Sequence, residues 1–356
     1  MTIRGQKNHY NIKFLKGYGH SISVNNSKIL LKDNHDPFSE PEIEEWYPNR
    51  MPYSKIVLSG NGYVSTEALT MLTEHNRNII LLDTQGNPQC VMSGVMSSLT
   101  ATKYRMGQYD TFRIPEKRDY LSRQIVKAKI ESQIQFLKST ENPTIIPSIE
   151  KLEKHLNNLE DDVLHSEAVT SRIYFGAFSK LIDERFKFSA RNSPITVKKY
   201  GATDVINALL NYGYSVLAGE ISKFIHGVGL DPYYGFYHKN HTSFKSLVYD
   251  MMEPFRWLVE CAVWKISIAK SRHRISKKQY SRAKNGTVVL EYGLVKSFLE
   301  LLERQFSQEK KYDYRHGKKT KSGLKSVQEI TIVKSTIQNL TEFCIEKRII
   351  FEPILK

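Results

Sequence analysis

The sequence contains few cysteines, no long apolar run and too few acidic residues to balance its lysines and arginines. Cys90, Cys261 and Cys344 lie far apart and form no Cys-x-x-Cys pair. This spacing excludes a disulfide framework and a thiolate zinc site, and it favours the cytoplasm as the location. The longest uncharged apolar segment, residues 205–219, contains two asparagines and two tyrosines. We therefore expect no transmembrane helix and no signal peptide.

Several motifs of nucleotide-binding and hydrolytic enzymes are also absent. Gly17-Tyr18-Gly19 is not followed by the third glycine of a dinucleotide-binding turn, and the chain has no GxxxxGK[ST] loop. It has no GxSxG sequence and no HExxH sequence either. These absences argue against nucleotide-cofactor enzymes, ATPases, serine hydrolases and zinc proteases.

The charge of the chain is strongly positive. Its 356 residues include 52 Lys and Arg against 37 Asp and Glu, a net charge of +15. With 40% hydrophobic and 25% charged residues, the remaining composition is that of a globular protein with a substantial core. The excess of positive charge predicts an anionic partner, either nucleic acid or a membrane surface.

Residues 1–96 predict a small β domain. Short β-favouring runs alternate with Gly, Asn, Asp and Pro, and Val64, Ala68 and Leu72 recur at helical spacing within them. This pattern predicts one helix among the strands, and the acidic stretch 33–45 predicts a surface loop. The expected strands are residues 10–14, 20–24, 28–31, 55–58, 78–82 and 89–92.

Residues 97–356 predict a second, mainly α-helical domain, so the expected fold class is α+β. Leu121, Ile125 and Ala128 begin a 3.6-residue rhythm that recurs almost to the C-terminus. Prolines fall in the breaks between the periodic segments. The expected helices are residues 117–139, 148–160, 162–183, 202–227, 246–270, 293–306 and 326–346.

Two segments of the second domain concentrate the positive charge. Residues 265–284 contain eight basic residues and no acid, and residues 310–325 contain seven against one acid. A solvated surface explains one such run, but two runs interleaved with tyrosines favour phosphate and base contacts with nucleic acid. A bilayer would favour an amphipathic basic helix, which neither run shows. The candidate DNA-binding residues are Arg272, Arg274, Lys277, Lys278, Arg282, Lys284, Arg315, Lys318 and Lys319.

One histidine and several acids are candidates for catalysis. A turn-rich connector delivers His238 just before a helix on which Asp250 and Glu253 share one face. Acids beside a buried apolar stripe require a cation or a hydrogen-bond donor. The two acids also have a structural explanation, because negative charge stabilises the first turns of a helix. Glu167 is one of many helical glutamates, and its spacing alone does not select it.

Three blocks of the chain resemble the CRISPR-associated integrase and endonuclease of spacer acquisition, the Cas-one family. The order of β domain, glutamate helix, Asn-rich helix, histidine loop and acidic helix agrees as well. The blocks are IVLSGNGYVSTEA from Ile56, NALLNYGYS from Asn207, and GLDPYYGFYH from Gly229 with SLVYDMMEPF from Ser246.

This resemblance implies a dimerising N-terminal domain and a C-terminal domain that binds one divalent metal. It implies Glu167, His238 and Glu253 as metal ligands and Asp250 as a supporting acid of the catalytic site. Two carboxylates and an imidazole suit Mn²⁺ or Mg²⁺, and the imidazole favours Mn²⁺. The implied reaction is attack of a DNA 3′-hydroxyl, or of water, on a phosphodiester.

The implied partners are duplex DNA, DNA with single-stranded 3′ ends, a second copy of the chain and the small second CRISPR adaptation protein. Casposon transposases are a related alternative with the same chemistry. They often add a C-terminal DNA-binding domain, which we do not expect because the chain stops soon after its last predicted helix. A third alternative is a non-catalytic basic scaffold, in which Glu167, His238 and Glu253 only cap helices or border the core.

Overall fold

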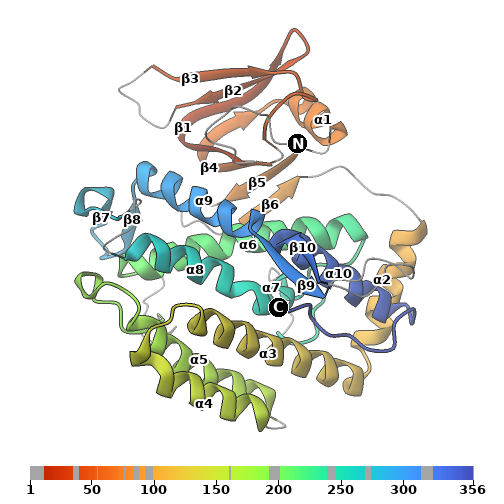
Figure 1. The fold of residues 1–356 in the computed structure, drawn as a ribbon. Helices are drawn as coiled ribbons and strands as arrows, with labels where there is room; N and C mark the ends of the chain where they lie inside the picture. The colour runs from red at the N-terminus through yellow and green to blue at the C-terminus, as the bar shows by residue number, and fades with distance from the viewer. Residues whose placement is uncertain are drawn as a thin grey trace.

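In the computed structural model, a six-stranded sheet forms the N-terminal part and helices form most of the remainder (Figure 1). This arrangement confirms the predicted α+β class. The structure describes residues 12–34, 40–53, 55–75, 77–82, 88–92, 99–159, 162–191, 201–238, 245–268, 274–313 and 324–355.

The sheet is mixed, with strand order β3-β2-β1-β4-β5-β6. Strand β4 pairs in parallel with both β1 and β5, and the other neighbours are antiparallel. Helix α1 (Thr66–Glu74) follows β4, and the Ser65 side chain caps its N-terminus. The strands are β1 (Ile12–Asn25), β2 (Lys28–Asp33), β3 (Glu42–Trp46), β4 (Lys55–Val64), β5 (Asn78–Leu82) and β6 (Pro88–Met92).

Neighbouring residues of a strand point to opposite faces of the sheet, and here both faces are buried. Leu15 and Ile56 belong to a core shared with α1, whereas Phe14 and Val57 join the large core of the helical part. The Phe14 ring meets Tyr212 edge to face at 6.2 Å between centroids. The sheet is therefore packed directly on the helices (Figure 1). The predicted boundary after residue 96 stays a prediction, and it falls between β6 and α2, outside the described residues.

A buried ion pair also joins the two parts. Lys55 Nζ on β4 lies 3.1 Å from Glu220 Oε2 on α6, and both side chains are buried. Burial acts to lower the pKa of Lys55, but the charges of Glu220 and Glu303 outweigh it and raise the pKa. An unpaired buried charge is costly, so any other placement of the sheet on the helices that separated Lys55 from Glu220 would be disfavoured.

Two strand predictions require correction. Residues 12–25 form one strand instead of two, because Gly17 (φ 101°) and Gly19 (φ 82°) accommodate a register shift within it. The stretch 33–45 is not entirely a loop, since Glu42–Trp46 forms the edge strand β3. Its acidic character suits an edge, and Glu44 accepts hydrogen bonds from the side chains of Lys13, Trp46 and Tyr53.

The helical part is built around α6, which is buried along most of its length and contacts α7, α8, α9 and α10. Among the described helices, none is both long and apolar enough to cross a membrane. The helices are α2 (Leu99–Phe112), α3 (Pro115–Lys138), α4 (Ile146–Asn157), α5 (Val163–Ser179), α6 (Val205–Val228), α7 (Ser246–Met252), α8 (Arg256–Ser267), α9 (Tyr292–Ser307) and α10 (Glu329–Cys344).

Helix α2 was not expected, because it has almost no apolar stripe. Its buried Phe112 packs against Tyr234 and Phe236, and polar bonds add to this contact. The Gln108 amide donates to the carbonyls of Asp231 (2.9 Å) and Tyr234 (2.7 Å), and its oxygen accepts from the Asp231 N–H. The Tyr109 hydroxyl donates to Asp231 Oδ2 at 2.8 Å. Helix α2 therefore supports the start of the loop that carries His238.

The predicted helix 246–270 is wrong as a single helix. It divides into α7, a 3-10 turn over Glu253–Phe255, and α8, because Pro254 has no N–H to continue the α-helical ladder. Two hairpins were also missed, and the helix predicted from residue 326 begins at Glu329. The hairpins pair β7 (Tyr280–Arg282) with β8 (Val288–Leu290), and β9 (Glu309–Asp313) with β10 (Leu324–Gln328).

Candidate active site

The fold brings together the four acid and histidine residues that the sequence singled out. Glu167 lies on α5, His238 in the loop after α6, Asp250 on α7 and Glu253 in the 3-10 turn that follows it. Helix α3 passes beside this turn and adds Lys129, which the sequence analysis did not identify.

Asp250 organises the histidine loop. Its carboxyl oxygens accept hydrogen bonds from the backbone N–H groups of Phe236 (2.7 Å), Tyr237 (3.1 Å) and His238 (2.9 Å). Asp250 Oδ1 also lies 2.7 Å from His238 Nδ1. Because Nδ1 is engaged, Nε2 is the ring nitrogen that faces Glu253, at 3.9 Å from Oε1. A carboxyl group behind one ring nitrogen is the usual support of a metal-binding histidine.

The same loop packs tightly on α7. The Gly235 N–H donates to Ser246 Oγ at 3.0 Å, and this hydroxyl donates to the Tyr233 carbonyl at 2.6 Å. A Cβ at Gly235 would lie 2.4 Å from Asp250 Oδ2 and 2.9 Å from the Leu247 nitrogen. Position 235 therefore admits only glycine unless the loop or α7 moves.

Lys129 bridges the two glutamates. Its ammonium lies 2.7 Å from Glu253 Oε2 and also contacts Glu167 Oε1. The Lys129 side chain is only 7% exposed, so both ion pairs are largely shielded from water. The sequence held one signal for this residue: a lysine stands four positions after Ile125, within the apolar rhythm of α3.

A buried polar network extends behind Glu253. Arg256 donates from Nε to Glu253 Oε1 at 2.9 Å, and its Nη2 lies 2.8 Å from the same oxygen. The guanidinium stacks 4.7 Å from the centre of the Tyr214 ring. The hydroxyls of Tyr214 and Tyr174 donate to the fully buried Glu260 at 2.7 and 2.5 Å. This network limits the positions that Glu253 can adopt.

The pKa values reflect these partners. Burial acts to raise the pKa of Glu253, but Arg256, Lys129 and His238 outweigh it and hold the pKa at about 2. Burial likewise opposes ionisation of Glu167, yet the charge of Lys129 lowers its pKa below the ordinary value. The pKa of Lys129 is raised despite burial, because Glu253 and Glu167 stabilise its charge. Glu167, Glu253 and Lys129 are therefore ionised at neutral pH.

The donor set fits a divalent cation. Two carboxylates converge on a single cationic atom, the Lys129 nitrogen, and the His238 Nε2 faces the same glutamate. Within the described residues, no three His, Cys, Asp or Glu side chains are already arranged around one point as metal ligands. The Lys129 nitrogen explains why the two carboxylates do not meet at one point, because it lies between them.

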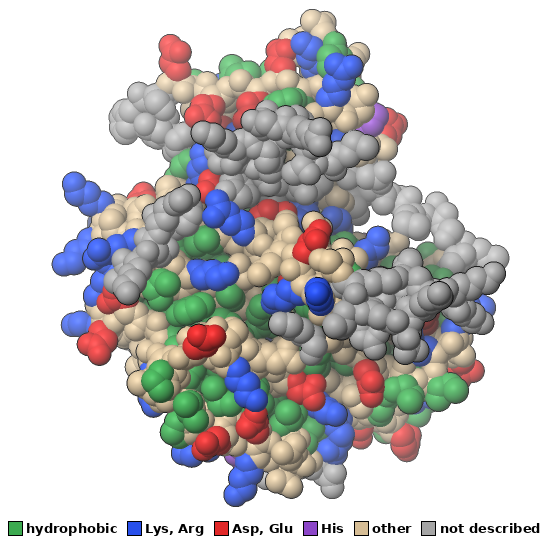
Figure 2. Space-filling view, viewed as in Figure 1, with side chains coloured by type: hydrophobic (Ala, Val, Ile, Leu, Met, Phe, Trp, Pro, Cys, Tyr) green, Lys and Arg blue, Asp and Glu red, His purple; other side chains and the backbone are tan. Residues whose placement is uncertain are grey.

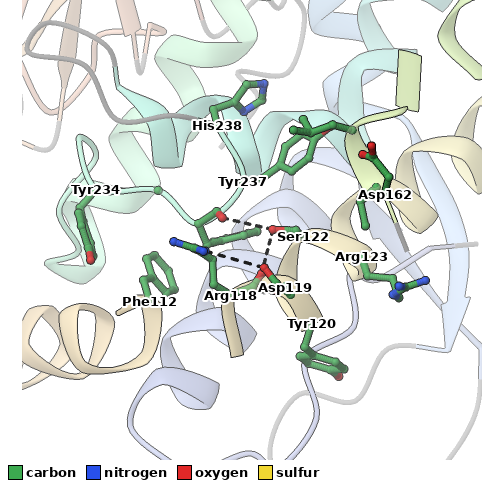
Figure 3. A pocket seen from close by; sticks show the side chains of 14 residues that line it. Phe112, Arg118, Asp119, Tyr120, Ser122, Arg123, Asp162, Tyr234, Tyr237 and His238 are labelled. Atoms are coloured by element: carbon green, nitrogen blue, oxygen red, sulfur yellow. Dashed lines mark hydrogen bonds and ion pairs between the residues drawn. The ribbon is translucent and has the colours of Figure 1, made fainter. Parts of the chain in front are cut away.

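A cavity of about 980 Å³ opens beside His238. Figure 3 shows His238 and Tyr237 above this cavity, with Arg118 and Arg123 of α3 below it. Ser122 at the base donates to the Phe236 carbonyl at 3.2 Å and so ties α3 to the histidine loop. The cavity reaches the acid and histidine cluster through His238, and its lining carries two arginines and two aspartates, Asp119 and Asp162.

The described basic residues of the first run lie on the surface. Arg274, Lys277, Lys278, Arg282 and Lys284 are exposed around the β7–β8 hairpin, and none forms an ion pair with a described residue. Lys and Arg side chains gather at the left of Figure 2, where Figure 1 places this hairpin. The other candidates, Arg272, Arg315, Lys318 and Lys319, lie outside the described residues.

One tyrosine of the second run differs from its expected role. Tyr312 is buried, at 3% exposed, and its hydroxyl donates to Glu329 at 2.6 Å. It is therefore unavailable for stacking on a base. Burial raises its pKa, and the charge of Glu329 adds to this effect.

Comparison with known proteins agrees with the resemblance seen in the sequence. Residues 14–304 match the family model described as CRISPR associated protein Cas1. The CRISPR-associated endonuclease Cas1 1 of Archaeoglobus fulgidus is 28% identical over 263 residues, which cover 67% of this chain and 73% of that protein.

Solved structures share the fold. A casposase bound to its integration product has a TM-score of 0.81 and 24% identity, and the match covers 96% of this chain and 92% of that one. A Cas6-RT-Cas1–Cas2 complex has a TM-score of 0.72 and 17% identity, covering 99% of this chain and 37% of that one. Since the family model spans most of the sequence, the chain belongs to the CRISPR-associated Cas1 family, whose members require a divalent metal.

Proposed function

We propose that this protein is a metal-dependent DNA endonuclease and integrase that joins DNA 3′-hydroxyl ends into target DNA during CRISPR spacer acquisition. The observation that carries the proposal is the convergence of Glu167, Glu253 and the His238 Nε2 next to an open cavity that His238 lines. Family membership and the named activity of the Archaeoglobus relative support it.

Each site residue has a separate role in this proposal. Glu167, Glu253 and His238 hold Mn²⁺ or Mg²⁺, with Mn²⁺ favoured by the imidazole ligand. When bound, the metal polarises the phosphodiester and stabilises the leaving oxygen. Asp250 is a positioning residue, since it holds the ring through Nδ1 and the loop through three backbone N–H groups. Lys129 neutralises the two glutamates, and a cation held by them would have to displace its ammonium.

The attacking oxygen comes from the DNA or from water. Burial raises the pKa of Tyr237, and the charges of Glu167 and Glu253 raise it further, so this hydroxyl is a poor nucleophile. A DNA 3′-hydroxyl gives transesterification without ATP, and water gives strand cleavage at the same site.

The cationic surfaces hold the DNA. Duplex backbones lie against the exposed residues of the β7–β8 hairpin, and a single-stranded 3′ end enters the cavity past Arg118 and Arg123. We infer a homodimer as the working unit, acting in the cytoplasm. The second adaptation protein is a further expected partner, in keeping with the Cas1–Cas2 composition of a structural neighbour.

The chemical group at the 3′ end of the DNA that is to be joined, the donor DNA, tests the reaction type. A labelled donor with a free 3′-hydroxyl, incubated with Mn²⁺ and a target duplex, should give a longer or branched product. A donor that ends in a 3′-phosphate or a dideoxynucleotide should give none, and chelator should stop the reaction. Equal joining of blocked and free donors, or a protein–DNA adduct on denaturing gels, would overturn the proposal.

Matched variants test the site. Glu167→Gln, His238→Ala and Glu253→Gln should each abolish joining and cleavage while most DNA affinity remains, because phosphate contacts lie elsewhere. Glu150→Gln, on the exposed face of α4, is the control and should retain both activities. Wild-type joining by Glu253→Gln would remove this residue from the site.

Salt dependence tests the DNA-binding surface. If about six phosphates are neutralised, affinity should fall on the order of a thousandfold between about 50 and about 200 mM salt. Alanine at Arg274, Lys277 and Lys278 should flatten this slope by about one unit for each lost contact. An unchanged slope would mean that these side chains do not contact DNA.

Casposon transposases remain the alternative assignment, because they perform the same reaction. The neighbourhood of the gene distinguishes the two roles. A repeat array beside it supports spacer acquisition, whereas transposon end repeats support transposition.

A further inference from the structure

Two cations of the chain already neutralise the two carboxylates that are proposed to hold the metal. The Lys129 ammonium contacts both Glu167 and Glu253, and Arg256 contacts Glu253 through Nε (2.9 Å) and Nη2 (2.8 Å). The pKa of each carboxyl group is lowered, and that of each cation is raised. These groups therefore carry two negative and two positive charges at neutral pH. Asp250 lies behind the histidine, where its oxygens accept from three backbone N–H groups.

This balance restricts how a divalent cation can bind. The side chains of Lys129 and Glu253 are 7% and 2% exposed, so water screens their charges poorly. A divalent cation added to groups of zero net charge leaves positive charge uncompensated, which is costly where water is scarce. Binding costs less if one of the two cations leaves the carboxylates and an anion arrives with the metal. A DNA phosphodiester supplies such an anion.

Of the two cations, Lys129 is the one that can change partners. Arg256 places two nitrogens on one oxygen of Glu253, and its guanidinium carbon lies 4.7 Å from the centre of the Tyr214 ring. A guanidinium held in this way is fixed in orientation, whereas lysine carries a compact ammonium on a flexible four-carbon chain. The Lys129 ammonium also lies between the two carboxylates, where a metal held by both would bind.

Helices α3 and α5 both lead from the cavity that His238 lines to this cluster. Ser122 lies at the base of the cavity (Figure 3) and precedes Lys129 by seven residues, so the two share a face of α3. Val163 lines the cavity and precedes Glu167 by four residues on α5. Side chains of a helix lean toward its N-terminus, so those of Lys129 and Glu167 lean toward the cavity. A DNA strand in the cavity would bring its phosphates to this side of the cluster.

We propose that Lys129 couples metal binding to DNA binding. Without DNA, its ammonium neutralises Glu167 and Glu253 and keeps the affinity for the metal low. When DNA binds, the ammonium leaves the carboxylates and donates a hydrogen bond to an oxygen of the reacting phosphodiester, so that both carboxylates can hold the metal. The inference rests on the proposed function for the metal and for DNA as the substrate. It adds Lys129 to the residues that contact the reacting phosphate.

The affinity for Mn²⁺, measured by electron paramagnetic resonance of the free ion, tests this coupling without the reaction. The probe is a branched duplex of the integration-product type, with a dideoxynucleotide at the 3′ end beside the branch to block the reverse reaction. This DNA should tighten Mn²⁺ binding to the wild type by about 5- to 150-fold, the usual range for two coupled sites. Lys129→Met should bind Mn²⁺ more tightly than wild type without DNA, and its gain on adding DNA should be at least about fivefold smaller. Lys127→Met, at an exposed position of α3, is the matched control and should show the wild-type gain.

A second measurement uses the wild-type protein alone. A methylphosphonate at the branch point removes the negative charge of the reacting phosphate, and the DNA should then change the Mn²⁺ affinity by less than about threefold. An undiminished gain with this neutral linkage would overturn the inference. An equal gain in wild type and Lys129→Met would overturn it as well.

The outcomes for this inference and for the proposed function are distinct. Wild-type protein that joins a free 3′-hydroxyl donor, but whose Mn²⁺ affinity does not change with the branched DNA, would refute the role of Lys129 alone. Coupled binding of Mn²⁺ and DNA without any joining or cleavage would refute the proposed function and leave the role of Lys129 intact.

Discussion

Replacing Lys129 by methionine tests the central feature of the site, a buried ammonium between two metal-ligand candidates. Methionine keeps the length of the side chain and removes its charge. Glu167 and Glu253 then lose their common partner. Removing one member of a buried ion pair costs about 3–5 kcal/mol. We expect the lower end, about 3 kcal/mol, because Arg256 still pairs with Glu253 and the Glu167 side chain is 25% exposed.

Thermal denaturation in chelator measures this loss. At about 2–4 °C per kcal/mol, the melting temperature should fall by about 6–12 °C. Lys127→Met is the control, since this lysine is exposed and its contact with Glu131 is 3.9 Å long. Its melting temperature should stay within about 2 °C of wild type.

Manganese should reverse the effect. In the wild type, the metal ligands must first release the Lys129 ammonium, whereas in Lys129→Met they carry uncompensated charge. Each tenfold gain in metal affinity adds about 1.4 kcal/mol of stability at saturating metal. The rise in melting temperature on adding Mn²⁺ should therefore be larger in the variant than in the wild type. Equal rises, or a variant as stable as wild type in chelator, would refute this account of Lys129.

Three further predictions follow from single contacts. Gly235→Ala should abolish strand joining but not DNA binding, because its Cβ would lie 2.4 Å from a carboxyl oxygen of Asp250; normal joining kinetics would contradict this. Burial acts to raise the pKa of Glu44, but the hydrogen bond from Lys13 and the aromatic donors outweigh it, so the pKa lies below 4.5. Glu44 therefore adds stability above pH 4.5 that is lost as the pH falls toward its lowered pKa. The melting temperature of Glu44→Gln should accordingly fall less than that of wild type between about pH 7 and about pH 3, and parallel curves would contradict the assignment. Lys55→Met should lower the free energy of unfolding in urea by about 3 kcal/mol, and a change below about 0.5 kcal/mol would show that its ion pair is not needed.

Much of the fold could be predicted from local pattern. The short β-favouring runs located five strands of the sheet, and the 3.6-residue rhythm located α3 to α6, α9 and α10 to within a few residues. The features missed lack such a pattern. Helix α2 has almost no apolar stripe and docks through Phe112, Gln108 and Tyr109, and β3 consists largely of glutamates at a sheet edge. The break in the helix at Glu253–Phe255 depends on Pro254.

The sequence by itself determined the charge, the fold class and the resemblance that selected Glu167, His238, Asp250 and Glu253. Only the tertiary structure decided which side chains meet. Periodicity reports how one element buries its own face, and it carries no information about the residue that a distant element brings to that face. Lys129 on α3 reaches Glu167 on α5 and Glu253 before α8 because the three segments pack together. Trp264 on α8 likewise meets Phe136 only because α3 packs against α8.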